Sequence, residues 1–165
     1  MSVPEDGKGP ARKDARPEGD VEAIVRRLMT AFQRMDAKAM LDIYSDDVVI
    51  ESPFHESGMT EEGAFRKYVG RAEVAKYLEG FSQFKQLHFV DEVYRPTADG
   101  RSVYIEARGD CIMADGSPYK NRYVFRFDVD GGRIVRLVEY VNPITAAPAF
   151  GRTIPPVPAT TKRGN

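Results

Sequence analysis

The chain has 165 residues, of which 42% are hydrophobic and 30% charged, enough for one domain with a core and too few for two. Its 24 basic and 25 acidic residues give a net charge of -1, so no global positive field exists to attract nucleic acid. A single cysteine excludes an intrachain disulfide. One cysteine and two histidines are too few ligands for a structural zinc site. A metal site built from carboxylates stays conceivable, but no metal is expected.

The two ends of the chain have little to bury. Residues 1–19 hold three glycines, three prolines and eight charged residues, which predicts a disordered tail. This segment also lacks the apolar stretch of a signal peptide, and no apolar run approaches the roughly 18 to 20 residues that cross a bilayer. We therefore expect a cytoplasmic protein without membrane contact. From Pro143 to residue 165, repeated prolines predict an extended arm.

The body between these ends, residues 20–142, opens with helical patterns. Asp20 can cap a first helix, whose apolar residues recur at three- and four-residue spacing up to Met35. Asp36 can cap a short second helix, and a third helix begins at Arg71. A short strand is predicted over residues 48–54.

The second half of the body changes to a β pattern. Three Asp-Gly pairs, at residues 99–100, 115–116 and 130–131, separate β-rich runs of about a dozen residues. They predict a four-stranded antiparallel meander over residues 85–96, 101–113, 119–129 and 133–142, strongly twisted and curved because the strands are long. Helices first and a meander second indicate an α+β fold with the helices on one face of the sheet.

Alternation identifies the inner face of this sheet. In the third strand Tyr123, Phe125 and Phe127 point one way, and the charged residues between them point the other. A three-residue turn after Asp130 would pair residue 123 with 139 and 125 with 137, which gathers the aliphatic residues of the last strand beside these aromatics. A two-residue turn would place them beside charged residues, so the pattern favours the three-residue turn.

This register places Glu139 on the inner face, between Leu137 and Val141 and opposite Tyr123. Burial alone should raise the pKa of such a carboxyl group. Alternatively, the carboxylate pairs with an arginine such as Arg108 or Arg136. The preceding strand contributes several small residues to the same face, and small residues beneath an aromatic helix predict a ligand pocket.

The expected pocket supplies both apolar and polar contacts. Candidate ligand-binding residues are Phe32, Tyr44, Ser52, Phe54, Tyr77, Phe81, Cys111 and Phe125. The aromatic residues among them are equally compatible with an ordinary core, and the cysteine is expected to be chemically inert because no activating base or helix N-terminus is visible. Residues 55–69 form either a lid over the pocket mouth or an ordinary surface loop.

Several segments together resemble the nuclear transport factor 2-like superfamily. These are the first helix, AMLDIYSDDVVIESPF, the helix start at Gly70-Arg71, and GRIVRLVEYVNP. The superfamily includes ketosteroid isomerase and the SnoaL-like polyketide cyclases. YIEARGDC and NRYVFRFDVDGGRIVRLVEYVNP resemble the phenazine biosynthesis PhzA/PhzB proteins most. The resemblance implies a cone-shaped α+β barrel with a pocket between sheet and helices, and a homodimer packed through the outer sheet face.

The resemblance carries over to individual residues selectively. The acid/base glutamate of PhzA/PhzB matches Glu139, whereas their third-helix histidine is replaced by Tyr77. Ser52 stands where ketosteroid isomerase has its aspartate base, and Ala31 stands where its first helix has a phenolic donor. The oxyanion-side aspartate of that enzyme maps near Tyr123, which could still donate a hydrogen bond.

These inferences lead to one functional hypothesis with two alternatives. The hypothesis is a cofactor-independent isomerase, cyclase or condensation catalyst of secondary metabolism, in which Glu139 moves a proton on a small apolar or aromatic carbonyl compound and Tyr123 polarises the carbonyl. The first alternative is a non-catalytic small-molecule binding or scaffold protein of the same fold. Water activation as in limonene epoxide hydrolase is the second, but its Asp/Arg/Asp relay has no visible counterpart in this sequence.

Overall fold

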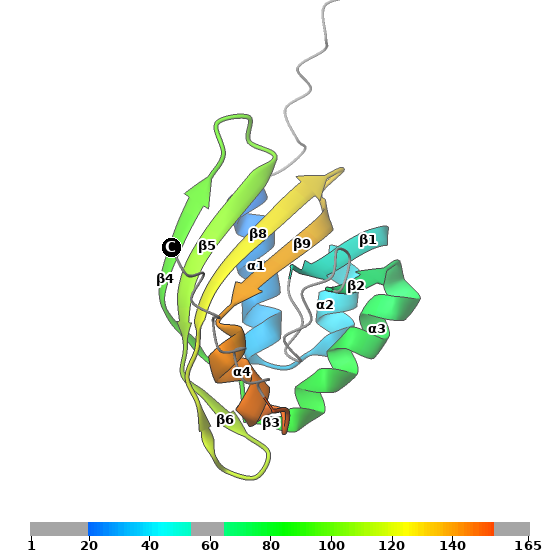
Figure 1. Cartoon of the computed structure of the whole chain (residues 1–165). Helices are drawn as coiled ribbons and strands as arrows, with labels where there is room; N and C mark the ends of the chain where they lie inside the picture. Colours follow the sequence, from blue (N-terminus) through cyan, green and yellow to red (C-terminus); the bar gives the residue numbers. More distant parts are fainter. Residues whose placement is uncertain (1–19, 54–64, 154–165) are drawn as a thin grey trace, which may run out of the picture.

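The computed structural model describes residues 20–53 and 65–153, and it has the predicted α+β architecture. A strongly curved six-stranded sheet carries α1 (Val21–Gln33), α2 (Ala37–Ile43) and α3 (Arg71–Glu79) on one face. Figure 1 shows β4, β5, β8 and β9 running side by side, with α1 crossing behind them and α3 to one side. The layers form the cone-shaped α+β barrel that the sequence predicted.

Local signals in the sequence fix the helix starts. The Asp20 carboxylate accepts a hydrogen bond from the backbone N–H of Glu22 at 3.0 Å, and Asp36 accepts one from Ala39 at 3.0 Å. The apolar stripe of α1 is buried against the sheet. All three predicted helix starts are confirmed. None of the helices in residues 20–53 and 65–153 is long and apolar enough to cross a membrane.

The main sheet has the strand order β2-β1-β9-β8-β5-β4. The predicted meander is confirmed: β4 (Phe89–Pro96), β5 (Ser102–Gly109), β8 (Arg122–Asp130) and β9 (Arg133–Val141) pair antiparallel. The first strand, β1 (Tyr44–Ser52), pairs parallel with β9 and antiparallel with β2 (Arg66–Val69). Strand β2 falls in the segment predicted as a lid or loop, of which residues 55–64 lie outside the described residues.

Three of the four long strands predicted for the meander are broken, because the sheet bends sharply. Their ends form a second small sheet of β3 (Phe84–Gln86), β6 (Cys111–Met113) and β7 (Pro118–Tyr119). The breaks lie together: the N–H of Asp110 donates to the His88 carbonyl at 2.8 Å, and the N–H of Gly109 donates to the Asn121 carbonyl at 2.9 Å. The bend closes one end of the barrel (Figure 1).

The β8–β9 turn differs from the prediction. Residue pair Asp130 and Arg133 closes a two-residue turn, whose Gly131 and Gly132 have φ angles of 53° and 73° as a type I′ turn requires. A bulge at Val135 then shifts β9 by one residue, so the aliphatic side chains still point inward. The predicted register was therefore wrong, and Glu139 lies opposite Phe125 instead of Tyr123.

The segment after the sheet does not begin as extended chain. Residues 143–149 form α4 (Pro143–Ala149), which starts with a proline and is capped by Asn142, whose side-chain oxygen accepts from the N–H of Ile144 at 3.0 Å. Ala146 and Ala147 are buried. The prediction of an extended arm was wrong for this stretch because the capping signal outweighs the prolines. Residues 154–165 lie outside the described part.

Candidate functional site

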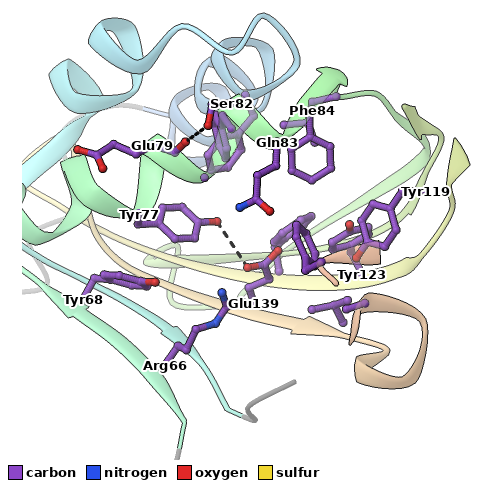
Figure 2. Close-up of a pocket in the computed structure, with 18 of the residues that line it drawn as sticks. Arg66, Tyr68, Tyr77, Glu79, Ser82, Gln83, Phe84, Tyr119, Tyr123 and Glu139 are labelled. Atoms are coloured by element: carbon purple, nitrogen blue, oxygen red, sulfur yellow. Dashed lines mark hydrogen bonds between the residues drawn. The ribbon is translucent and has the colours of Figure 1, made fainter. Parts of the chain in front are cut away.

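A cavity of about 530 Å³ lies between the concave face of β8 and β9, helix α3, the short 3₁₀ helix η1 (Gly80–Gln83) and α4. Figure 2 shows side chains from these elements converging on the cavity. Aromatic side chains form about half of its wall and suit contact with a flat ligand, and charged and polar side chains form much of the rest. Its lining includes Phe32, Tyr68, Tyr77, Phe81, Phe84, Leu87, Phe89, Tyr119, Tyr123, Phe125 and Phe150, with Arg66, Lys76, Glu79, Gln83, Glu139 and Arg152 as polar groups.

Glu139 projects from β9 into this cavity and is half-buried. Its carboxylate oxygen Oε2 accepts hydrogen bonds from the Tyr77 hydroxyl and the Ser52 hydroxyl, both at 3.5 Å. The dashed line in Figure 2 marks the bond from Tyr77. Both bonds are long and therefore weak. Ser52 is itself buried behind the carboxylate and does not line the cavity.

The arginines that the sequence offered as partners of Glu139 are bonded elsewhere. Arg108 donates two hydrogen bonds to Asp91, at 2.7 and 2.9 Å, and Arg136 binds Glu51 through two nitrogens, at 2.5 and 3.1 Å. Figure 2 shows instead Arg66 of β2 pointing toward Glu139. Sequence reasoning missed Arg66 because it treated this segment as a lid or loop, although Arg66 and Tyr68 alternate as strand residues with a common face do.

Two tyrosines that face Glu139 remain neutral hydrogen-bond donors. Burial raises the pKa of Tyr77 and that of Tyr123 well above the ordinary value, and the negative charge of Glu139 adds to both shifts. Both phenols are therefore protonated throughout the physiological pH range. Such groups can donate to an oxygen that gains negative charge in a reaction.

The ring of Tyr123 is held tightly. It stacks on Phe125 with ring centroids 5.2 Å apart and meets the edge of Phe89 at 5.2 Å. Gly109 makes room for it, since a Cβ atom there would lie 2.9 Å from the ring atom Cε2. The small residues of this strand thus accommodate an aromatic ring. The prediction that they leave the void of the pocket was wrong, because Ala107, Gly109 and Cys111 are not among the lining residues.

The other predicted site residues divide into two groups. Phe32, Phe81 and Phe125 line the cavity. Tyr44 and Cys111 do not: both are buried in the core, and the thiol donates to the His88 carbonyl at 3.5 Å while burial raises its pKa. They fill core space behind the cavity wall. The remaining candidate, Phe54, lies outside the described residues.

Sequence reasoning missed a second aromatic group at the closed end of the barrel. Phe150, which follows α4, packs edge-on against Phe84 and Tyr119, with centroids 6.0 and 5.6 Å apart. These residues come from α4 and the small sheet, neither of which the sequence predicted. The described residues contain no group of three or more His, Cys, Asp or Glu side chains placed to hold a metal ion.

Comparison with known proteins identifies relatives. The chain is 29% identical over 132 residues to the uncharacterized protein YesE of Bacillus subtilis, covering 77% of this chain and 84% of that protein. A crystal structure of a candidate isomerase from Bacillus subtilis has a TM-score of 0.68 at 25% identity, covering 82% of this chain and 95% of that one. A candidate polyketide cyclase from Xanthomonas campestris has a TM-score of 0.60 at 25% identity, covering 74% and 90%.

A phenazine biosynthesis-related protein from Pseudomonas aeruginosa has a TM-score of 0.61, covering 86% of this chain and 94% of that one. Its sequence identity is only 15%, so this likeness shows the shared fold alone. The model of the SnoaL-like domain matches residues 25–137, more than half of the chain. The chain therefore belongs to the SnoaL-like domain family.

Proposed function

We propose that this protein is a cofactor-independent enzyme that moves a proton on a small, largely apolar carbonyl compound, as an isomerase or cyclase. The observation that carries the proposal is the Glu139 carboxylate, which lies inside an aromatic cavity within reach of the Tyr77 phenol. Family membership and the candidate isomerase and cyclase among the similar structures support it.

Glu139 acts first as a base. It takes the proton from the carbon next to the carbonyl, and the electron pair of that C–H bond moves toward the carbonyl oxygen to form an enolate. The Tyr123 hydroxyl donates a hydrogen bond to this oxygen as its negative charge grows, while the single hydroxyl proton of Tyr77 is directed at Glu139. In an isomerase the protonated Glu139 returns its proton to another carbon. In a cyclase the enolate carbon attacks a second carbonyl group of the same molecule, and the alkoxide that forms there takes the proton back from Glu139.

The surroundings of Glu139 suit this role. The hydroxyl groups of Ser52 and Tyr77 contact its carboxylate, and the Arg66 side chain points toward it (Figure 2). The rings of Phe32 and Phe81, 5.6 Å apart in an edge-on arrangement, form an apolar wall that excludes water from the reacting atoms.

The test is hydrogen exchange on a small bicyclic ketone. In deuterium oxide, NMR follows the loss of the α-protons of 2-indanone with and without the protein. We expect exchange above the buffer rate, and a drop of at least about 100-fold in the protein-dependent rate for Glu139→Gln, since a positioned base contributes roughly 10² to 10⁴-fold. Glu22→Gln is the matched control, because Glu22 lies in the first turn of α1, paired with Arg26 at 2.6 Å, and does not line the cavity.

The second candidate function is binding without chemistry. One observation favours it: Ser52 occupies the position of an aspartate base in ketosteroid isomerase and serves here as a hydrogen-bond donor to Glu139. Binding of 2-indanone, or of larger bicyclic ketones, without any exchange above the buffer rate would support this function and contradict the enzyme.

The PhzA/PhzB-like role is the narrower form of the proposal. The glutamate of that family matches Glu139, which supports shared acid/base chemistry, whereas Tyr77 in place of their histidine supports a different substrate or reaction. A role in secondary metabolism and a location in the cytoplasm stay predictions.

A homodimer formed through the outer sheet face is also part of the proposal. Val93, Glu106, Val124 and Tyr140 lie in one row across β4, β5, β8 and β9, and the three apolar ones are 42%, 38% and 48% exposed. An exposed apolar row on a sheet suits contact with a second copy. Val138, which strand alternation with Tyr140 puts on the same face, is only 4% exposed and contributes little.

A further inference from the structure

Gln83 lines the cavity from the end of η1, where the chain passes from α3 into the small sheet. Its carbonyl oxygen accepts from the N–H of Ala114 at 2.8 Å. The N–H of the next residue, Phe84, donates to the Phe81 carbonyl, and Phe84 pairs with Met113 of β6. The backbone that carries the Gln83 side chain is therefore held from both the helical side and the sheet side.

The Gln83 side chain lies along Gly80. Residues three apart share one side of a 3₁₀ helix, and Nε2 of Gln83 lies 3.9 Å from the point that a Cβ atom of Gly80 would occupy. Figure 2 shows the amide pointing from η1 toward Glu139 on the sheet. The missing side chain at Gly80 thus leaves the space in which the glutamine reaches the cavity.

The amide group of Gln83 is open to a ligand. Within residues 20–53 and 65–153 it forms no hydrogen bond with another residue. An amide offers two N–H donors and one carbonyl acceptor, and it carries no charge at any pH at which the protein is folded. The side chain is exposed in the empty cavity, so a bound molecule would replace solvent at this group.

The proposed reaction has a use for such a donor. An enolate oxygen accepts more than one hydrogen bond, and enzymes commonly place several donors around it, glutamine amides among them. The single hydroxyl proton of Tyr77 is directed at Glu139, which leaves Tyr123 as the phenolic donor. The Lys76 ammonium group is bonded to Glu73 at 2.6 Å. The open amide of Gln83 therefore suits the second donor position best.

We propose that Gln83 is a catalytic residue of this site, whose amide N–H donates a hydrogen bond to the substrate oxygen that gains negative charge. The inference rests on the proposed function, because it supplies the second donor of that reaction. A hydrogen bond to a charged oxygen is about twice as strong as one to a neutral carbonyl. The amide therefore stabilises the enolate more than the bound ketone, and it raises the rate more than the affinity.

The test measures the pKa of bound 2-naphthol, whose phenolate resembles an enolate and absorbs at longer wavelengths than tyrosine. All proteins carry Glu139→Gln, which removes the carboxylate that would repel the phenolate. We expect Gln83→Leu to raise this pKa by about one unit, a tenfold loss of phenolate binding relative to phenol binding. Gln83→Glu should raise it further, because a negative charge of the same size then faces the phenolate. Gln86→Leu is the matched control, since Gln86 is exposed on β3 and does not line the cavity.

Two further readouts separate donation from a merely structural role. Naphthalene has the same rings without the hydroxyl group, and its affinity should not fall in Gln83→Leu. With Glu139 present, Gln83→Leu should slow the exchange of saturating 2-indanone about tenfold while its affinity for 2-indanone changes less than twofold. A distorted cavity would weaken the binding of all three compounds together.

Three results would overturn the role of Gln83: an unchanged pKa of bound 2-naphthol in Gln83→Leu, an equal loss of naphthalene and phenolate binding, or no binding of 2-naphthol to Glu139→Gln. The 2-naphthol assay needs no turnover, so it separates the two proposals. An unchanged pKa together with 2-indanone exchange that depends on Glu139 would refute the role of Gln83 alone. A raised pKa without any exchange in the wild-type protein would refute the enzyme and leave Gln83 as a donor to bound oxyanions.

Discussion

Tyr44 offers a sharp test, because the structure gives its hydroxyl no role. The side chain is completely buried, and its oxygen has no hydrogen-bond partner within residues 20–53 and 65–153. A buried hydroxyl without a partner costs about 1 to 3 kcal/mol relative to the same group in water. Tyr44→Phe removes the oxygen and keeps the ring that fills the core. We therefore expect the substitution to raise the free energy of unfolding by about 1 kcal/mol at pH 7, whereas most core substitutions lower it.

The gain in free energy of unfolding from Tyr44→Phe should increase in alkaline solution. Burial, helped by the charge of Glu139, raises the pKa of Tyr44 far above its usual value of 10.0. Above pH 10 the unfolded chain releases this proton and the folded protein keeps it, so the unfolded state binds fewer protons and stability falls as pH rises. The loss approaches about 1.4 kcal/mol per pH unit for this residue. Tyr44→Phe has no hydroxyl group to titrate. The difference in free energy of unfolding between this variant and the wild-type protein should therefore grow by about 1 kcal/mol between pH 10 and 11.

Urea unfolding at pH 7, 10 and 11 measures both effects, provided that the two proteins show equal m-values. Binding of 2-indanone should not change, since Tyr44 does not line the cavity. A loss of more than about 1 kcal/mol at pH 7 would mean that the hydroxyl has a partner, and a stability difference independent of pH up to 11 would mean that it is not desolvated. Either result would refute the reasoning.

Three further predictions follow from single contacts. Gly109→Ala would place a Cβ atom 2.9 Å from the Tyr123 ring, and we expect it to cost about 1 to 3 kcal/mol in urea unfolding and to slow 2-indanone exchange; a variant with wild-type stability and rate would contradict this. Arg136 lowers the pKa of Glu51 from 4.5, so Glu51 stabilises the fold above that pH and loses this effect as pH falls further. Glu51→Gln should therefore cost about 1 kcal/mol at pH 7 and nothing near pH 2, and an equal cost at both would speak against the ion pair. Tyr140→Lys should convert a dimer into a monomer in light scattering, and an undiminished dimer would exclude this sheet face as the interface.

The helices were predictable because their signals are local. A capping aspartate and an apolar stripe lie within one short stretch of sequence, and Asp20 and Asp36 form the expected capping bonds. The inward direction of Glu139 was predictable from alternation. Its register was not, because a two-residue turn with a bulge at Val135 gives the same inner face as the three-residue turn that the pattern favoured. Both turns give the same alternation of inward and outward side chains, so this alternation alone could not distinguish them.

The closed end of the cavity was not predictable from periodicity, for a different physical reason. Strands of two to four residues are too short to show a period, and β2, β3, β6 and β7 are all of this kind. Strands β3, β6 and β7 exist because the sheet bends at residues 87–88, 110 and 120–121 and the freed strand ends pair with one another, whereas β2 pairs with β1 in the main sheet. Phe84 and Tyr119 come from the small sheet, so this end of the cavity depends on a tertiary bend.

The bend and the cap of α4 are linked by Asn121. Its backbone carbonyl accepts from Gly109 at the point where the strands break, and its side chain joins Tyr119 to the cap of α4. A regular strand through this position would pair every backbone group and would turn the side chains at 119, 121 and 123 to one face. The Asn121 side chain instead donates to the Tyr119 hydroxyl and to the Asn142 carbonyl, while Tyr119 and Tyr123 line the cavity. The interruption that hid this part of the site from sequence reasoning is therefore the feature that ties the cavity residue Tyr119 to the start of α4, the helix beside the cavity residues Ala146 and Phe150.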